Sequence, residues 1–265
     1  MAILMLQAQD KLNVQDPICQ YVPECPAAWQ AITIHQLLTH TSGIPNFTGF
    51  RDYQATKGTP SPPEQTIARF KDKPLDFQPG EGWSYSNSGY ILLGSIIEQA
   101  SRQSYEVFLQ EHIFASLQMK NTGYDHNDSS LAIGYTGTGG LWREAEPIDM
   151  TIPYAAGGLY STVEDLYLWD QALYTEQLLP QELLDLMFTA HAKMPVAGLR
   201  YGYGWTVGEM NKHQAVAHGG GIEGFVTEIR RYIDDRVTII VLSNRDTTGV
   251  GSAADLIAEA VFEGQ

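Results

Sequence analysis

The sequence lacks several features that would narrow its function class. Its 265 residues include only two cysteines, which excludes a disulfide-rich scaffold and a cysteine-rich zinc module. No apolar run approaches the roughly 20 residues that a membrane helix needs. Basic residues are scarce, with 16 Lys+Arg against 31 Asp+Glu and a formal net charge of −15. Because so acidic a surface repels phosphate backbones and anionic lipids, nucleic acids and membrane surfaces are not expected as partners.

Three common catalytic signatures are missing or stand in the wrong context. The sequence holds no G-x-S-x-G, which argues against an α/β-hydrolase, and no H-E-x-x-H. Its histidines are scattered, and His35 and His40 are wrongly spaced to share a helix face, so no metal site is expected. Residues 219–224 satisfy G-x-G-x-x-G, but a strand pattern follows where a dinucleotide site needs a helix. We therefore expect no cofactor.

What is present indicates a folded chain of helices followed by strands. Hydrophobic residues make up 43%, enough for a sizeable core. Residues 46–82 and 121–153 have the composition of irregular loops, and Ser161-Thr162-Val163-Glu164 fits a capping box in which Glu164 reaches back. The apolar spacing predicts helices over Ala2–Leu6 (buried all round), Ile32–Leu38, Ser88–Ala100, Tyr105–Leu117, Asp165–Leu173, Gln181–Phe188 and Ser252–Phe262.

The pattern changes after Arg200. Strands are predicted over Tyr201–Val207, Ala215–His218, Phe225–Ile233 and Val237–Ser243, with Asp234-Asp235 as the turn of a hairpin. This order indicates an α+β or mixed α/β fold rather than alternating βαβ units. We expect a mainly helical lobe over residues 1–195 and antiparallel strands with a final helix over residues 196–265.

The start of the chain is unusual. A mature protein rarely begins inside a helix that is buried all round, so we expect an upstream segment to be missing. Residues 1–6 have no basic leader and no small-residue cleavage site, which argues against a signal peptide. Cys19 and Cys25 are close enough to pair in an oxidising compartment, but two buried thiols fit equally well. The sequence leaves their pairing and the compartment open.

Four phrases carry a resemblance to a known family. Tyr85-Ser86-Asn87 lies in WSYSNSGYILLGSIIE (83–98), and the other phrases are LLTHTSGIP (37–45), AAGGLYSTVEDLYLW (155–169) and HGGGIEGF (218–225). In this order they resemble the serine β-lactamase and penicillin-binding protein family, in its class C-like branch with related esterases and D-amino-acid peptidases. The resemblance implies a β-lactamase/transpeptidase-like fold, with a helical lobe on an antiparallel sheet that here lacks its N-terminal strands. By the same resemblance, the protein would be periplasmic or extracellular.

The resemblance also implies a mechanism, in which a serine in S-x-x-K attacks an amide or ester carbonyl of a small molecule or peptide and forms an acyl-enzyme. Tyr85 matches the tyrosine that acts as general base and leaving-group acid, and Asn87 matches the asparagine that bonds the substrate amide and the lysine. His218 stands where β-lactamases carry a lysine, which favours the esterase and peptidase relatives. Gly220 and Gly221 lie on the substrate strand, where the Gly221 N–H would form half of the oxyanion hole.

One departure from the family decides what we expect of this chain alone. None of its seven lysines has a serine three residues earlier, so S-x-x-K is absent, and the chain is expected to start just after it. A phenol titrates near about 10 in water, so Tyr85 needs a neighbouring cation to act as a base at neutral pH. We therefore expect no acyl-enzyme from this chain alone. Ser42, Ser86 and Ser88 are weak substitutes, since none has a lysine or histidine at a diagnostic spacing.

Three hypotheses follow. The first is a serine hydrolase without its nucleophile segment, which would form a homodimer through its uncovered sheet edge or by swapped elements. The second is a non-catalytic member that binds a peptide, a D-amino-acid compound or a partner in the old cleft. The third and weakest is an active enzyme with a rearranged site. The sequence alone does not identify the substrate, nor does it say whether the natural protein lacks the missing segment.

Overall fold

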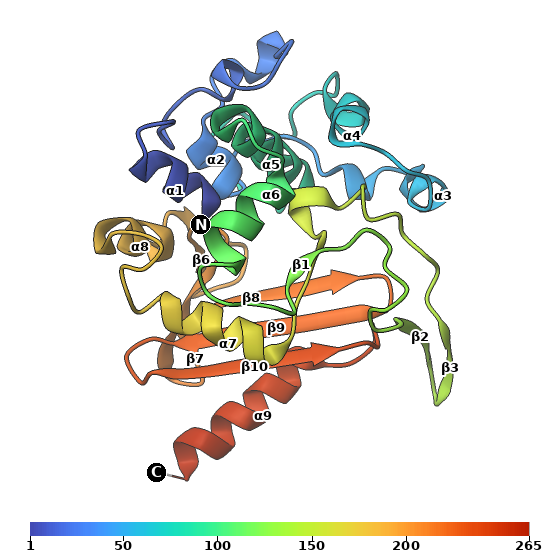
Figure 1. The fold of residues 1–265 in the computed structure, drawn as a ribbon, viewed down its shortest axis with the longest axis vertical. Coiled ribbons are helices and arrows are strands. Elements are labelled where there is room, and N and C mark those ends of the chain that lie inside the picture. Colours follow the sequence, from blue (N-terminus) through green and yellow to red (C-terminus); the bar gives the residue numbers. More distant parts are fainter. Residues whose placement is uncertain (265) are drawn as a thin grey trace.

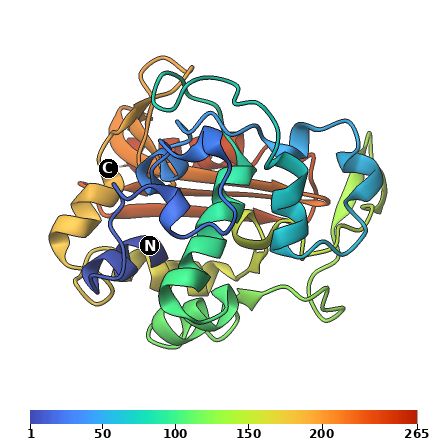
Figure 2. The ribbon, with the colours of Figure 1, turned by 90° about the horizontal axis from the view of Figure 1, so that it is seen from above.

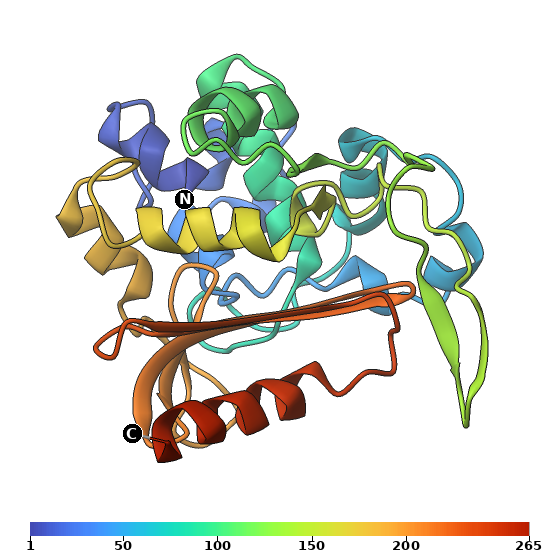
Figure 3. The same ribbon diagram turned by 60° about the horizontal axis from the view of Figure 1, so that its bottom comes forward.

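A computed structural model of the chain describes residues 1–264 and arranges them in three layers. A six-stranded sheet forms the middle layer (Figures 1 and 3). The helical lobe covers one face of this sheet, and the long helix α9 (Val250–Glu263) covers the other. This arrangement confirms the mixed α/β class that the order of helices and strands predicts.

The helical lobe is built around one central helix, α5 (Asn87–Ser101), which Figure 2 shows passing through its middle. Ile91, Leu92 and Ile96 on this helix are fully buried, at the helical spacing that its sequence predicts. The other helices and helical turns before the main sheet are α1 (Ala2–Ala8), η1 (Ile18–Gln20), η2 (Ala27–Trp29), α2 (Ile34–Leu38), η3 (Phe47–Gly49), α3 (Tyr53–Thr56), α4 (Pro63–Phe70), α6 (Tyr105–Leu109), η4 (Gln110–Phe114), η5 (Tyr154–Ala156), α7 (Val163–Ala172) and α8 (Gln181–Phe188).

The predicted helices hold where the local pattern is strong. Helix α1 is buried on all sides, with residues 2–6 at most 8% exposed, and it packs against α5. Helix α8 has the predicted bounds. The helix expected over Tyr105–Leu117 is shorter, because α6 passes at Gln110 into the wider π-helical turn η4, which ends at Phe114.

The six-stranded sheet is antiparallel throughout, with the order β10-β9-β8-β7-β6-β5. Its strands are β5 (Ala192–Lys193), β6 (Arg200–Tyr201), β7 (Thr206–Met210), β8 (His213–Ile222), β9 (Phe225–Tyr232) and β10 (Val237–Ser243). A two-residue turn joins β8 to β9, and it needs glycine at Gly224 because φ is +78° there and a Cβ would lie 2.5 Å from Gly134. Two separate small pairs join β1 (Gly123–Tyr124) to β4 (Leu159–Tyr160) and β2 (Tyr135–Thr138) to β3 (Leu141–Glu144).

Four local predictions were wrong. The strand expected over Tyr201–Val207 is broken, because the Gly202 N–H donates to the Trp205 carbonyl in a turn between β6 and β7. Residues 46–82 contain α3 and α4, and residues 121–153 contain β1 and the β2–β3 hairpin, so neither stretch is a plain loop. Glu164 does not complete a capping box: Thr162 caps α7 by accepting the Asp165 N–H at 3.3 Å.

The largest core cluster lies mostly within the helical lobe and reaches the sheet at Val216 on β8, and a smaller cluster lies between the sheet and α9. A buried ion pair ties the sheet to α7, since the Arg231 guanidinium on β9 donates to the Asp170 carboxylate and both side chains are 1% exposed. Thr238 on β10 donates a further hydrogen bond to Asp170 at 2.7 Å. This pair holds α7 against the sheet face that the helical lobe covers, opposite α9 (Figure 3).

Cys19 and Cys25 form a disulfide, with their Cα atoms 5.3 Å apart, so the pairing that the sequence left open is present in this structure. The bond closes a short loop around η1, in the segment between α1 and α2. As for membranes, none of the helices within residues 1–264 is both long enough and apolar enough to span a bilayer.

Candidate active site

The candidate site lies where strand β8 loses one of its neighbours. Residues 215–217 of β8 pair with β7 on one side and β9 on the other, whereas residues 218–222 pair with β9 alone. Within residues 1–264 no strand covers the other side of this second half. We call residues 218–222 the strand wall. Their backbone N–H and C=O groups on the open side are free to pair with an extended ligand.

The residues facing the strand wall come from the start of α5, and we call residues 84–88 the helix wall. The Tyr85 ring lies 6.3 Å from the His218 ring, between ring centroids. The structure therefore brings together two residues that are 133 positions apart in the sequence. Tyr85 is 40% exposed, so its side chain is accessible to solvent between the two walls.

The electrostatic setting of Tyr85 does not suit a base. Removal of water by the surrounding side chains raises the pKa of Tyr85 above its usual 10. Among the described residues no ammonium group acts on the pKa of Tyr85. Lys57, whose side chain is 9% exposed, places its Nζ 2.8 Å from Glu223 in the turn after β8. Lys57 is thus committed to a carboxylate. The Tyr85 phenol stays protonated at neutral pH.

Asn87 begins α5 and is tied to the segment before α3. Its backbone N–H donates to Asn46 Oδ1 at 3.1 Å, and its Nδ2 donates to Thr48 Oγ1 at 3.3 Å. The Asn87 side chain is half-buried, and no group within residues 1–264 donates a hydrogen bond to its amide oxygen. Asn87 is therefore fixed in place while one acceptor stays free for a ligand.

His218 faces Tyr85 from the strand wall and is held by a residue that the sequence analysis did not single out. Its Nε2 lies 3.1 Å from the hydroxyl of Tyr201 on β6, a side chain only 2% exposed. Burial lowers the pKa of His218, although a hydrogen bond to the Gly219 backbone and the nearby Glu228 act in the opposite direction. With its pKa lowered, His218 is neutral at pH 7. Tyr201 could not be found from the sequence, which marks it only as part of a strand.

The two glycines of the strand wall differ in what requires them. A Cβ on Gly220 would lie 2.4 Å from Thr227 Oγ1 on β9, so the neighbouring strand excludes a side chain. A Cβ on Gly221 would meet nothing within 4 Å. Neither residue has a positive φ, so backbone conformation does not demand glycine at either position. The bare surface at Gly221 leaves room for something outside this chain.

The serines considered as substitute nucleophiles have structural roles or are inaccessible. Ser88 is fully buried, and its Oγ accepts the Phe47 N–H at 3.0 Å and donates to the Pro45 carbonyl at 2.7 Å. Ser42 is 2% exposed and accepts the Ile44 N–H. Ser86 is 3% exposed. A substrate carbonyl cannot reach any of the three in this conformation.

His40, at the end of α2, is the second residue whose place the sequence analysis missed. It is 2% exposed, and its ring lies 4.3 Å from that of Tyr85 and 4.9 Å from that of Tyr201, between centroids. Its Nδ1 accepts the Ser86 N–H at 3.2 Å. His40 is thus buried and also in direct contact with the ring of Tyr85.

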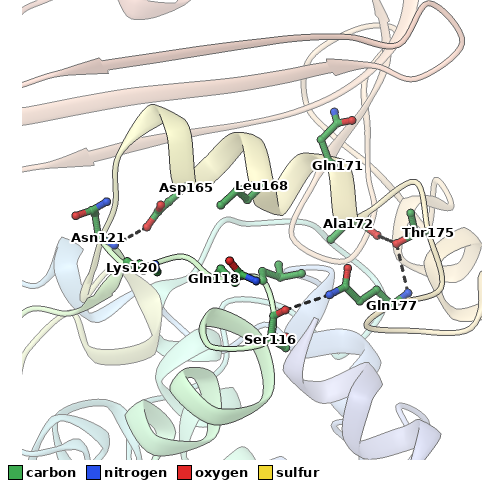
Figure 4. Close-up of a pocket in the computed structure, with 11 residues that line it drawn as sticks. Ser116, Gln118, Lys120, Asn121, Asp165, Leu168, Gln171, Ala172, Thr175 and Gln177 are labelled. Carbon is green, nitrogen blue, oxygen red and sulfur yellow. Dashed lines mark hydrogen bonds between the residues drawn. The ribbon is translucent and has the colours of Figure 1, made fainter.

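A separate polar groove of about 590 Å³ lies between α7 and the end of η4 (Figure 4). Its polar groups largely bond to one another: Asp165 accepts the Asn121 N–H at 2.7 Å, and Gln177 donates to the Ser116 carbonyl at 3.1 Å. It contains none of the residues of the two walls. In residues 1–264 no group of three histidine, cysteine or acidic side chains is placed to hold a metal ion.

Comparisons with known proteins match one family along nearly the whole chain. The family model described as Beta-lactamase matches residues 1–262. The chain is 30% identical over 286 residues to Penicillin-binding protein 4* of Bacillus subtilis (strain 168), covering 100% of this chain and 62% of that relative. It is 32% identical over 209 residues to the putative penicillin-binding protein PbpX of the same organism, covering 78% of this chain and 50% of that protein. The chain thus spans one half to about three fifths of these relatives.

Two solved structures resemble the fold closely. A D-stereospecific amidohydrolase from Streptomyces sp. superposes with a TM-score of 0.88 at 26% identity, covering 100% of this chain and 83% of that one. The octameric penicillin-binding protein homologue from Pyrococcus abyssi superposes with a TM-score of 0.84 at 29% identity, covering 100% and 63%. Both similarities extend over every element that builds the two walls.

Proposed function

The chain belongs to the β-lactamase family, and from that premise we propose that it forms most of a serine-hydrolase site that cleaves amide or ester bonds through an acyl-enzyme. In this proposal the lobe over residues 1–195 supplies Tyr85 and Asn87. Residues 196–265 supply His218, Gly220 and Gly221. A serine and a lysine from outside this sequence would complete the site.

One observation carries the proposal: Tyr85 faces the half of β8 that is open on one side, with its ring 6.3 Å from that of His218. An extended substrate could pair with the free edge of the strand wall while its reacting carbonyl lies beside Tyr85. Tyr85 would carry the proton to the leaving group, and Asn87 would bond the substrate amide through its free oxygen. The Gly221 N–H would stabilise the oxyanion, together with the N–H of the nucleophile.

The same residues explain why we propose that the chain is inactive alone. S-x-x-K is absent from the 265 residues, so both the attacking hydroxyl and the ammonium beside Tyr85 are missing. The raised pKa of Tyr85 keeps the phenol protonated at neutral pH. Loss of one oxyanion-hole donor typically costs about 100- to 1000-fold in rate, and here one donor is lost together with the nucleophile.

The proposed substrate class is a small molecule or peptide with an amide or ester bond. The Streptomyces neighbour is described as a D-stereospecific amidohydrolase, which supports an amide and suggests a D-configured residue at the cleaved bond. His218 is neutral where β-lactamases carry lysine, so it would hold a substrate carboxylate less firmly. This supports, as the natural substrate, a compound that an esterase or an aminopeptidase would cleave over a β-lactam.

The test starts from the DNA upstream of the Met1 codon. If it encodes an in-frame S-x-x-K, the extended and the 265-residue chains are each incubated with a fluorescent penicillin and an activated ester. Mass spectrometry then measures acylation. We expect a mass increase in the extended chain only, lost in its Tyr85→Phe variant and kept in Tyr167→Phe, a tyrosine on α7 that is 55% exposed. Acylation of the 265-residue chain would overturn its proposed inactivity, and no acylation of the extended chain would overturn the hydrolase itself.

The alternative is a non-catalytic member of the family that binds a peptide or D-amino-acid compound between the two walls. The absence of S-x-x-K from this sequence favours it. A stop codon or unrelated sequence upstream of Met1, combined with ligand-induced NMR shifts at Gly219–Gly221, would establish this alternative in place of the enzyme.

We also propose that the chain forms a homodimer through β10. This strand is last in the sheet order, and its outer edge is unpaired among the described residues. Its sequence, VTIIVLS, has no charged residue to block pairing, and α7 and α9 cover its two faces, which leaves the edge open. The Pyrococcus abyssi homologue is described as octameric, so self-association occurs in the family.

Analytical ultracentrifugation tests this dimer. We expect a dimer that dissociates in Leu242→Lys, on β10, and persists in Leu141→Lys, a control on the β2–β3 hairpin where leucine is 83% exposed. If the unmodified chain is a monomer, the proposal is refuted. A monomer is the result expected if a strand from outside this sequence pairs with β10 in place of a second copy.

We propose an extracytoplasmic location, which the Cys19–Cys25 disulfide supports because such bonds persist in oxidising compartments. Thiol labelling of the protein isolated from its native source, under conditions that prevent oxidation, would test it. Two reactive thiols would count against the location.

A further inference from the structure

His40 makes two hydrogen bonds that bracket Tyr85. Its backbone carbonyl accepts the Ser84 N–H at 3.1 Å, and its ring Nδ1 accepts the Ser86 N–H at 3.2 Å. Ser86 is extended, with φ −138° and ψ 111°. His40 therefore accepts hydrogen bonds from two backbone N–H groups of residues 84–86, as the carbonyl groups of a neighbouring strand would. Tyr85 lies between the two bonded positions.

The backbone of His40 is itself held in an uncommon conformation. Its φ is +58°, in the left-handed region that favours glycine. The His40 N–H donates to the Leu37 carbonyl at 3.3 Å, and the next residue, Thr41, donates to the Gln36 carbonyl at 2.9 Å. These bonds fix the end of α2. The left-handed turn aims both the carbonyl and the ring of His40 at the segment that carries Tyr85.

Besides filling space, the His40 ring provides a hydrogen-bond acceptor at Nδ1. Because Nδ1 accepts a hydrogen bond, the proton of the neutral ring is on Nε2. Burial and, secondarily, the nearby His218 lower the pKa of His40 to about 3, so Nδ1 stays an acceptor at any pH above that value. Within residues 1–264, Nε2 has no hydrogen-bond partner and the ring is packed among Trp83, Tyr90 and Tyr201.

The unpartnered Nε2–H of His40 shows whether histidine is present for its ring shape or for its acceptor nitrogen. A buried donor without a partner destabilises the fold, and a phenylalanine of similar shape at this position would avoid that penalty. Phenylalanine would however offer no acceptor to the Ser86 N–H. The acceptor at Nδ1 is thus what distinguishes histidine from an apolar ring here.

We propose that His40 is a positioning residue that holds Tyr85 facing the strand wall, through the two acceptors on either side of Tyr85 and the ring packed against its phenol. The inference rests on the proposed function only in treating Tyr85 as a site residue. The positioning itself is a property of the chain and does not require acylation.

The experiment observes Tyr85 directly in the full chain. 3-Fluorotyrosine at position 85 reports its environment by ¹⁹F NMR, before and after His40→Gly. Glycine suits the left-handed backbone and leaves a cavity the size of the ring. We expect the ¹⁹F resonance to shift and broaden, and to return when free imidazole is added. Pyrrole has the same shape but no acceptor nitrogen, so it should not restore the signal.

The control is Val216→Ala, a truncation of a buried residue on β8 that should leave the ¹⁹F resonance in place. A resonance unchanged in His40→Gly, or restored equally by pyrrole, would overturn the proposal.

A measurement on the unmodified chain covers the case in which His40→Gly does not fold. The Ser86 N–H···Nδ1 bond should give a scalar coupling between the two nitrogen nuclei in a uniformly ¹⁵N-labelled sample. Absence of that coupling while the Ser86 amide is resolved would likewise overturn the inference. Neither measurement depends on a nucleophile, so failure of the proposed hydrolase would leave both results interpretable.

Discussion

The helix wall and the strand wall are built on opposite principles. The helix wall is held by side chains that reach across the sequence, with Ser88 bonding the segment at 45–47 and Asn87 bonding Asn46 and Thr48. The strand wall is held by backbone pairing with β9, and its central residues have no side chains at all. One wall depends on particular groups being present, and the other depends on groups being absent.

This difference separates stability from ligand access. On the helix wall a substitution removes a partner from a buried polar group, which costs folding free energy. On the strand wall a substitution at Gly221 adds atoms to an open surface, which costs little stability but occupies the space for a ligand. The following changes test that division, from the largest expected loss of stability to the smallest.

Ser88→Ala should have the largest effect. It leaves the buried Phe47 N–H and Pro45 carbonyl without their partner, so we expect the free energy of unfolding to fall by about 2–4 kcal/mol. Urea denaturation followed by circular dichroism measures it. Ser84→Ala, on an exposed residue of the same wall, is the control. A loss below about 1 kcal/mol for Ser88→Ala would mean that water replaces the hydroxyl and that the helix wall is more tolerant than we infer.

Acid should destabilise the helix wall through His40. The pKa of His40 is lowered to about 3 in the folded chain, against about 6.5 when unfolded. Below pH 6.5 the unfolded chain therefore takes up a proton that the folded chain refuses, and stability falls as the pH falls towards 3. The slope is about 1.4 kcal/mol per pH unit, or roughly 2–3 kcal/mol between pH 6.5 and 4.5.

The measurement compares unfolding free energies over this pH range in the unmodified chain and in His40→Gln, which cannot titrate. We expect the difference between the two to shrink steadily as the pH falls. His126→Gln removes a histidine whose side chain is 65% exposed and serves as the matched control. If the unfolding free energies of His40→Gln and of the unmodified chain change in parallel with pH, His40 takes up its proton in the folded chain as readily as in the unfolded chain.

The sequence predicted the parts of this molecule that depend on neighbours along the chain. Apolar spacing located α5 and α8, and the family phrases named Tyr85, Asn87 and His218. It could not show that β6 stops at Tyr201, whose hydroxyl bonds His218 from 17 residues away. Nor could it show that Ser86 bonds a ring 46 residues earlier, because such contacts depend on the packing of distant segments.

Gly220→Ala probes the side of the strand wall that is already occupied. The new methyl group would lie 2.4 Å from Thr227 Oγ1, so β8 or the threonine must shift, at an expected cost of about 1–2 kcal/mol. The double variant Gly220→Ala with Thr227→Ala removes the clash and should recover most of that loss. Thermal unfolding of the two single variants and the double variant gives the coupling. Additive effects would mean that the crowding at Gly220 comes from elsewhere.

Gly221→Ala should have the smallest effect on folding and the clearest effect on the site. A methyl group there meets no atom of the chain within 4 Å and φ is not positive, so we expect the free energy of unfolding to change by less than about 0.5 kcal/mol. The same methyl group would stand where we place the ligand. Acylation of the chain extended by its S-x-x-K segment, or ligand binding if no such segment is encoded, should therefore fall at least tenfold. If Gly221→Ala binds or reacts normally, the ligand does not lie along the strand wall, and the division between a wall for stability and a wall for access is wrong.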